Sequence, residues 1–302
     1  MEAISTFDML KIGIGPSSSH TLGPWRAAEY WIKELKNSAL FDNVISIKIH
    51  LYGSLSLTGK GHASDYALML GLSGQDPEYT PTTDIHNIVN KIKKEKELKL
   101  NNEKPLKFNP KTDIIFEKEF LPFHPNGITF KAQLYSKKEI KDTYYSIGGG
   151  FVIKEELNKP KKNKPLSNTF PFSVVTGKDL LQFCQKENKA ISEIVLENER
   201  SLRTDSEIDL ELNRIWNTML ECMYTGCHTE GKLPGGLNVT RRAFEMHNSL
   251  KGDLKYNSPE EWLEIIKKTK VKFRQIFTWV SCFALAVNEV NASLGRLSLI
   301  HI

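Results

Sequence analysis

Three serines and a histidine lie together in the segment GIGPSSSHTLGP, residues 13–24. A pattern typical of an amphipathic helix starts directly after them. Hydroxyl and free backbone N–H groups in front of a helix can bind an anion, because the first N–H groups of a helix have no partner inside it. A plain helix cap fits the same pattern, and the G-x4-G-K-[ST] motif of phosphate-binding loops is absent. His20 favours a ligand site, since imidazole exchanges protons near neutral pH.

Two further histidines lie in turns rich in glycine or proline. In YGSLSLTGKGHASD, residues 52–65, two glycines flank Lys60, and His62 begins a helical pattern. Glycines let the backbone approach a ligand closely, and His62 can accept a proton there. A helix cap or a surface position is the alternative interpretation. His124 lies between prolines in PFHPNG, a sequence that is also typical of a tight turn before a strand.

Polar residues gather again toward the C-terminal end of the sequence. The turn TEGKLPGGLNVTRRA ends in Arg241 and Arg242, which can anchor a carboxylate or a neighbouring domain. In ALAVNEVNASLGR, an apolar helix pattern is followed by Asn288, Glu289 and Asn291. These residues indicate either a buried polar network or a contact with substrate.

The hydrophobic pattern predicts the framework that must position these residues. An alternating strand over 45–51 is expected to turn Ile45, Ile47, Ile49 and Leu51 inward. Together with a helix over 24–36 and a strand over 128–134, this strand predicts an α+β domain at 1–157. The triple glycine at 148–150 indicates a hinge or a close approach of the backbone to a ligand. Proline, lysine and asparagine predict a linker at 158–168. Only helical patterns follow, so an all-α domain is expected at 169–302.

Composition excludes several classes of protein. The 302 residues suffice for two domains of roughly 100–200 residues each. The sequence has 41 lysines and arginines and 36 acidic residues, which gives a net charge of +5. The lysines cluster at 91–107 and 154–164, as in a solvated face and a linker rather than a nucleic-acid surface. The sequence has neither a signal peptide pattern nor an apolar run long enough for a bilayer. We expect a cytoplasmic protein without nucleic-acid or membrane partners.

The four cysteines do not match a metal-binding pattern. They are Cys184, Cys222, Cys227 and Cys282. The C-x4-C spacing of Cys222 and Cys227 begins a plant-type ferredoxin pattern, but Glu230 stands where the third cysteine is needed. In a cytoplasmic chain, separate buried thiols are the expected interpretation.

Five of these segments together resemble the iron–sulfur L-serine dehydratase family of bacteria. They are FDMLKIGIGPSSSHTLGP, YGSLSLTGKGHASD, YYSIGGGF, TEGKLPGGL with RRA, and FALAVNEVNAS, in that family's order. The resemblance extends from residue 4 to residue 296. It implies a β domain followed by a catalytic α domain. It also implies a [4Fe–4S] cluster that acts as a Lewis acid while L-serine is converted to pyruvate and ammonia.

The resemblance also implies roles for individual residues. His62 matches the proposed catalytic base, and His20 and His124 match other catalytic histidines of the active site. The expected substrate-binding residues are Ser17, Ser18, Ser19, Thr21, Lys60, Asn288 and Asn291. The serines and Thr21 are expected to receive the carboxylate of the substrate. The family further implies a homodimer for the full-length enzyme.

The sequence departs from the family after Arg296. The family continues into helices that carry the cluster cysteines, whereas this chain continues as LSLIHI, and none of its cysteines matches a cluster ligand. We therefore expect a C-terminally truncated chain with no metal ligands of its own, in which residues 297–302 are non-native. Such a chain is expected to expose an apolar face on its helices and to be inactive. A non-catalytic module that binds serine for regulation is the alternative.

Overall fold

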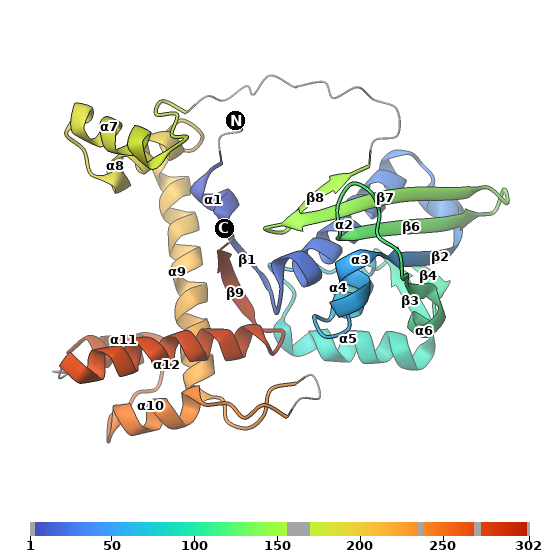
Figure 1. Cartoon of the computed structure of the whole chain (residues 1–302). Coiled ribbons are helices and arrows are strands. Elements are labelled where there is room, and N and C mark those ends of the chain that lie inside the picture. Colours follow the sequence, from blue (N-terminus) through green and yellow to red (C-terminus); the bar gives the residue numbers. More distant parts are fainter. Residues whose placement is uncertain (1–3, 156–169, 235–237, 269–272, 301–302) are drawn as a thin grey trace.

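The computed structural model describes residues 4–155, 170–234, 238–268 and 273–300, and the linker predicted at 158–168 lies outside these ranges. An N-terminal part of mixed helices and strands is followed by a mostly helical part (Figure 1). The predicted fold class is therefore confirmed.

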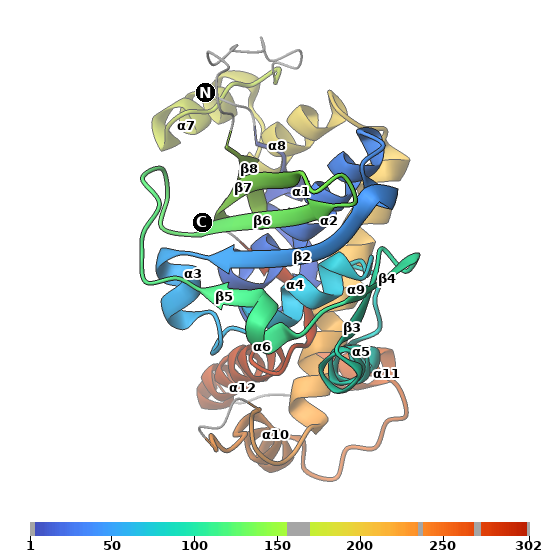
Figure 2. The ribbon, with the colours of Figure 1, turned by 90° about the vertical axis from the view of Figure 1, so that its right-hand side faces the viewer.

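A five-stranded sheet forms the centre of the N-terminal part. Its strands, in spatial order, are β5 (Ile114–Phe116), β2 (Val44–Leu51), β6 (Gly127–Leu134), β7 (Glu139–Gly148) and β8 (Phe151–Lys154). β2 and β5 are parallel, and the other pairs are antiparallel. Figure 2 shows the sheet with helices α2 (Gly23–Asn37) and α4 (Ser64–Leu72) behind it.

The strand patterns place the core as expected, with one correction. The apolar residues of β6 are buried in alternation, and Ile47, Ile49 and Leu51 of β2 are buried as well. Ile45 was expected to face inward, but it is 40% exposed. The pairing of β2 with β6 shifts register between Val44 and Ser46. This irregularity reverses the alternation, so that Val44 is buried instead of Ile45.

Helix α2 closes one face of the sheet with large aromatic side chains. The Trp31 ring stacks on Phe130 with centroids 4.8 Å apart, and its indole N–H donates to Asp142 on β7 at 3.1 Å. Helix α4 packs closely on α2, because a Cβ added to Gly71 would stand 2.6 Å from the Trp25 carbonyl oxygen. The remaining elements of this part are α1 (Thr6–Met9), α3 (Gly53–Thr58), α5 (Thr82–Glu95), β3 (Glu97–Leu100), β4 (Lys104–Lys107) and α6 (Pro110–Asp113).

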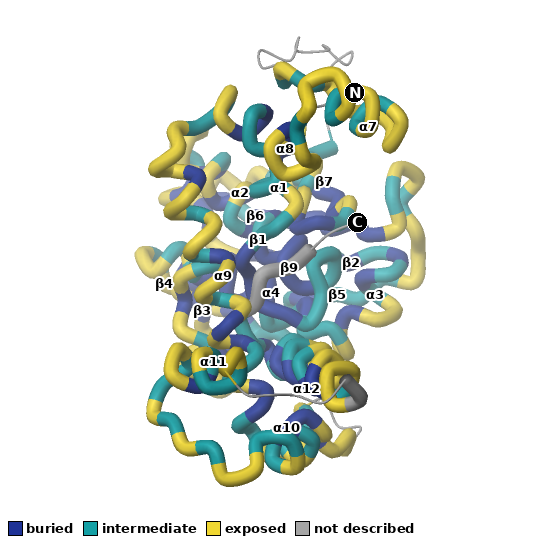
Figure 3. Tube along the Cα trace, turned by 90° about the vertical axis from the view of Figure 1, so that its left-hand side faces the viewer, coloured by how far each residue is buried: buried dark blue, intermediate teal, exposed yellow. Residues whose placement is uncertain are grey.

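The second part is arranged around one long helix. Its helices are α7 (Gly177–Glu187), α8 (Ile191–Arg200), α9 (Asp205–His228), α10 (Ala243–Lys251), α11 (Pro259–Lys268) and α12 (Phe273–Asn291). Helices α9 and α12 cross closely at Gly226, where an added Cβ would stand 2.4 Å from the Ala286 carbonyl oxygen. Helix α7, by contrast, buries none of its residues (Figure 3).

A short strand pair joins the two parts. β1 (Leu10–Ile14) pairs antiparallel with β9 (Arg296–Ile300), and both strands contact α9. In Figure 1 they lie between α9 and the sheet. The expectation of an all-α second domain was therefore incomplete, because the partner that makes β9 a strand lies at the other end of the sequence. That residues 297–302 are non-native stays a prediction.

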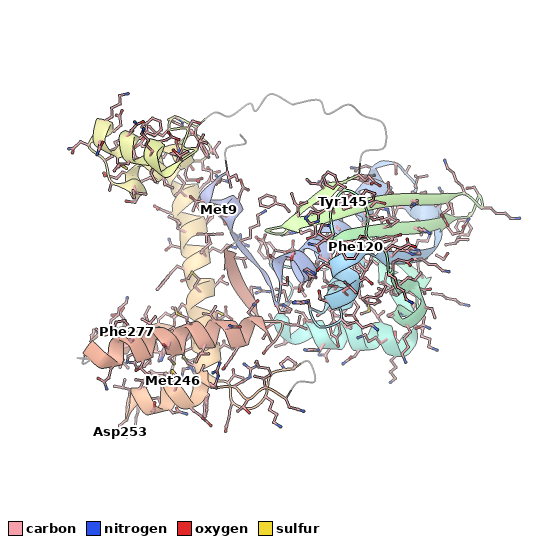
Figure 4. All side chains as sticks on the ribbon, viewed as in Figure 1. Met9, Phe120, Tyr145, Met246, Asp253 and Phe277 are labelled. Carbon is pink, nitrogen blue, oxygen red and sulfur yellow. The ribbon has the colours of Figure 1, made fainter. Side chains whose placement is uncertain are left out.

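Apolar side chains lie exposed on the helical part, as the sequence predicted. On α12, Ile276, Phe277 and Val280 are 47%, 63% and 60% exposed. Phe277 lies toward the end of α12 away from β9 (Figure 4). Among the residues that the structure describes, no helix combines the length and the apolar character needed to cross a bilayer.

A buried histidine in the helical core predicts a pH-dependent stability. His247 is fully buried, and its Nε2 accepts from the Trp262 indole N–H at 3.0 Å. Burial, followed by the charges of His228 and Lys251, lowers the pKa of His247 to about 4. An unfolded histidine has a pKa of about 6.5, so the unfolded chain takes up this proton first as the pH falls. From pH 7 to pH 5 the residue should therefore cost about 2 kcal/mol of unfolding free energy.

His247→Gln tests this expectation, because glutamine still offers an acceptor to Trp262 but does not titrate. Urea unfolding at pH 7 and pH 5 should show a smaller loss of stability on acidification for the variant than for the parent. Equal losses in both proteins would show that His247 does not carry the effect.

Candidate active site

The serine loop, defined here as residues 15–22, connects β1 to α2. Ser17 precedes a π-helical turn over Ser18–Leu22, and its hydroxyl accepts from the His20 N–H at 3.1 Å. Its carbonyl accepts from the Thr21 N–H at 2.9 Å. The N–H groups of the two serines after Ser17 stand in the first turn, where the helix supplies no acceptor. The loop thus carries amide and hydroxyl donors suited to an anion.

His20 is held between two hydroxyl groups. Its Nδ1 lies 2.8 Å from the Ser19 hydroxyl, and its Nε2 lies 2.9 Å from the Ser54 hydroxyl. Burial, with a smaller contribution from neighbouring His62, lowers the pKa of His20. The ring is therefore neutral at pH 7. Because a hydroxyl can donate or accept, both neutral tautomers of His20 can be satisfied.

His62 is oriented as a proton acceptor. Its Nδ1 lies 2.9 Å from the Thr58 carbonyl oxygen, and its ring centroid lies 5.0 Å from that of His20. A carbonyl only accepts, so Nδ1 must carry the hydrogen, and Nε2 keeps its lone pair in the neutral ring. This is the state that a general base requires.

Hydroxyl groups bind the serine loop to its neighbours through backbone carbonyls. The Thr21 hydroxyl donates to the His62 carbonyl at 2.7 Å. The Ser64 hydroxyl donates to the His20 carbonyl at 2.5 Å, and the Ser146 hydroxyl donates to the loop carbonyl of Ser19 at 2.8 Å. These bonds fix His20 and His62 relative to each other.

His124 lies in a different loop, whose backbone contacts Ser54. Its Nδ1 accepts from the Asn126 N–H at 3.2 Å, so in the neutral ring the hydrogen is on Nε2. The neighbouring Pro125 carbonyl accepts from the Ser54 N–H at 2.9 Å. Ser54 therefore connects the His124 loop with His20, the side chain that its hydroxyl contacts.

Of the other expected substrate-binding residues, only Asn291 has a hydrogen bond to the loop among the contacts of the described residues. The Lys60 ammonium lies over the ring of Phe116, 5.0 Å from its centroid, and Lys60 is exposed. Asn288 is exposed on α12. Asn291, at the end of α12, donates from Nδ2 to the Pro16 carbonyl at 3.0 Å.

The triple glycine forms the turn between β7 and β8. All three glycines have positive φ angles of 96°, 65° and 68°, which side chains rarely adopt. A Cβ on Gly150 would stand 2.7 Å from a methyl carbon of Leu22 in the serine loop. Gly150 thus approaches Leu22 of the loop closely, whereas nothing lies within 4 Å of a Cβ added to Gly148. The expected roles as a hinge or as a contact with a ligand stay predictions.

The polar residues near the end of α12 form a buried network. Arg241 is 8% exposed and donates to the Ser293 hydroxyl at 2.6 Å. The Glu289 carboxylate is 5% exposed and accepts from the N–H groups of Arg242 and Ala243 at the start of α10. A carboxylate stabilises a helix at this position. Arg241 thus anchors the turn to α12, and Glu289 belongs to a buried network, as one of the two interpretations predicted.

Comparisons with known proteins match both parts of the chain. The family described as serine dehydratase beta chain matches residues 5–157, and the family described as serine dehydratase alpha chain matches residues 186–298. The chain belongs to the bacterial L-serine dehydratase family. Its serine loop and the three histidines discussed above lie within the dehydratase beta-chain match.

Curated L-serine dehydratases align with nearly the whole sequence. The protein of Haemophilus influenzae is 37% identical over 297 residues, L-serine dehydratase 1 of Escherichia coli is 36% identical over 296, and the protein of Helicobacter pylori is 34% identical over 300. The alignments cover 97%, 97% and 98% of this chain and 62% of each relative. The chain thus spans about three fifths of the length of these dehydratases.

The cysteines of this chain do not fit an iron–sulfur cluster where the structure describes them. Cys227 and Cys282 are buried with sulfurs 3.8 Å apart, so they are neighbours rather than the separate thiols expected. Contact with Cys282 and burial raise the pKa of Cys227, which keeps it a thiol. A cluster needs three or four thiolates, and no group of three or more potential metal ligands is arranged around one point among the described residues.

Proposed function

We propose that this chain supplies the substrate-binding and proton-abstracting part of an L-serine dehydratase. Such a lyase removes water from L-serine, and the resulting aminoacrylate hydrolyses to pyruvate and ammonia. The observation that carries the proposal is the position of His62. The centroid of the His62 ring, which carries the accepting Nε2, lies 5.0 Å from the centroid of the His20 ring. The His62 carbonyl accepts a hydrogen bond from the Thr21 hydroxyl of the serine loop. The names of the relatives support serine as the substrate.

In this proposal the serine loop binds the carboxylate of serine. The side chains of Ser17, Ser18 and Ser19 and the amide groups at the start of the turn supply the donors. The Thr21 hydroxyl, expected to bind the carboxylate as well, donates its hydrogen to the His62 carbonyl and supports the loop instead. A neutral His20 suits a loop that binds the carboxylate, because its ring forms a hydrogen bond with the Ser19 hydroxyl and adds no charge. Lys60 and Asn288 remain proposed contacts of the substrate.

His62 then removes the proton from the α-carbon at its Nε2. The electron pair of that C–H bond forms the new double bond, and the hydroxyl leaves from the β-carbon. His20 or His124 is proposed to donate a proton to the departing hydroxyl, so that it leaves as water while His62 holds the proton taken from the α-carbon. The resemblance assigns activation of the hydroxyl to a [4Fe–4S] cluster, which stays a proposal for the whole enzyme, as do its homodimeric state and its cytoplasmic location.

We also propose that the 302-residue chain alone binds serine without converting it, because its described cysteines supply only one close pair of thiols. The test is anaerobic reconstitution with iron and sulfide, followed by calorimetry with L-serine and an assay for pyruvate. Saturable serine binding without pyruvate is expected. Cluster absorbance together with turnover would contradict this account of the cysteines.

A non-catalytic serine-binding module is the second candidate. The same calorimetry distinguishes it when D-serine and L-alanine are compared with L-serine. A dehydratase site needs the α-proton near His62 and should discriminate strongly against the D-enantiomer. Tight binding of both enantiomers would favour the regulatory module.

A further inference from the structure

Asn291 is fitted between the end of α12 and the beginning of the serine loop. Its Nδ2 donates to the Pro16 carbonyl at 3.0 Å. A Cβ added to Gly15 would stand 2.1 Å from Asn291 Oδ1 and 2.4 Å from the Asn291 carbonyl oxygen. The Gly15 N–H, in turn, donates to the Gly295 carbonyl at 3.1 Å. The loop and the end of α12 are therefore in direct backbone contact at this point.

We propose that Asn291 is a positioning residue that holds the serine loop in the form that binds the substrate carboxylate. It acts through the Pro16 carbonyl and through its packing on Gly15, not by touching the substrate. The inference rests on the proposed function only in naming serine as the ligand of the loop. Pro16 directly precedes Ser17, so the position of its carbonyl fixes where the π-helical turn begins.

The orientation of the amide makes asparagine specifically suited to this position. Asn291 Oδ1 is buried, and no hydrogen-bond partner reaches it. If the amide were turned over, this oxygen would face the Pro16 carbonyl, and two acceptors would oppose each other. Aspartate has the same shape but lacks the N–H donor, so it would place an oxygen against Pro16 and a charge in a site without donors.

The contact between Asn291 and Pro16 also connects the helical part with the proposed substrate site. Leu22 of the serine loop packs with Cys222 of α9 and Val290 of α12 in one apolar cluster. Asn291 is the residue after Val290, so the same helix end holds both ends of the loop. Loss of the Asn291 bond should therefore release the start of the loop while the Leu22 contact keeps its end docked.

The test uses Asn291→Asp in the 302-residue chain, with Asn217→Asp as the matched control. Asn217 is exposed on α9, and its substitution makes the same chemical change away from the loop. Two quantities are measured: L-serine affinity by calorimetry, and hydrogen exchange of the Thr21 and Leu22 amides, which bond to the Ser17 carbonyl. N291D should weaken serine binding by about tenfold or more and accelerate exchange of both amides. N217D should change neither.

The outcomes separate this inference from the proposed function. If N291D binds serine as tightly as the parent, or loses affinity while the two amides exchange at the parent rate, Asn291 does not position the loop. If the parent does not bind serine, the proposed function fails, and the exchange rates still decide the positioning role. If N291D does not fold, Asn291→Ala replaces it with the same two readouts, since it adds no charge.

Discussion

Replacing His62 with alanine is expected to lower kcat for serine by about 10²–10⁴-fold with little change in KM. A general base acts in the transition state, so its loss slows the chemical step without removing ground-state contacts. The Nδ1 contact with the Thr58 carbonyl leaves Nε2 as the accepting atom, and alanine removes it. Pyruvate formation by the catalytically competent enzyme measures this, and serine calorimetry on the 302-residue chain should give a nearly unchanged affinity.

His86→Ala is the control for this substitution, because His86 is exposed on α5 outside the site. It should leave both kinetic constants within about twofold, as expected of an exposed position. An unchanged kcat in H62A would remove His62 from the role of base. His20 and His124 would then be the remaining candidates.

Gly226→Ala is expected to have the largest effect on stability. The added Cβ would meet the Ala286 carbonyl oxygen at 2.4 Å and the Ala286 Cα and carbonyl carbon at 2.6 Å. These are backbone atoms of α12 and cannot rotate away, so α9 and α12 must separate. Overpacking of this kind costs about 1–3 kcal/mol. Because α12 ends in Asn291, serine affinity should fall together with the unfolding free energy.

Gly177→Ala is the matched control, since nothing lies within 4 Å of a Cβ added there. This glycine begins α7, and alanine at a compatible position stabilises by about 0.4–1 kcal/mol. Urea unfolding of both variants measures the comparison. Equal midpoints would show that α9 and α12 adjust to the added methyl group without loss.

Local patterns suggested those parts of the candidate site that lie within one segment. Ser17 and His20 belong to one turn, and His62 follows a glycine-rich turn, so composition alone singled them out. Ser54 and Ser146 were missed. Each lies in a segment that the sequence singled out for its glycines, but its role depends on a contact with a distant segment. Hydrophobic alternation carries no information about such contacts.

The same limit explains the differences in the fold. The inward side of β6 was predicted because its alternation is unbroken, whereas the irregular pairing of β2 reversed Ile45. The strand β9 needs β1 as its partner, and no local pattern of five residues indicates a partner so distant. The adjacent thiols of Cys227 and Cys282 likewise follow from the close crossing at Gly226, which only the packed helices reveal.

The bond between Asn291 and Pro16 joins residues that are 275 positions apart in the sequence. Ribosomes add roughly 5–20 residues per second from the N-terminus, so tens of seconds pass between the synthesis of these two residues. Until residue 291 has been added, the nascent serine loop lacks the helix end that holds it. The growing polypeptide should therefore acquire the proposed affinity for serine only after nearly all of this sequence has left the ribosome.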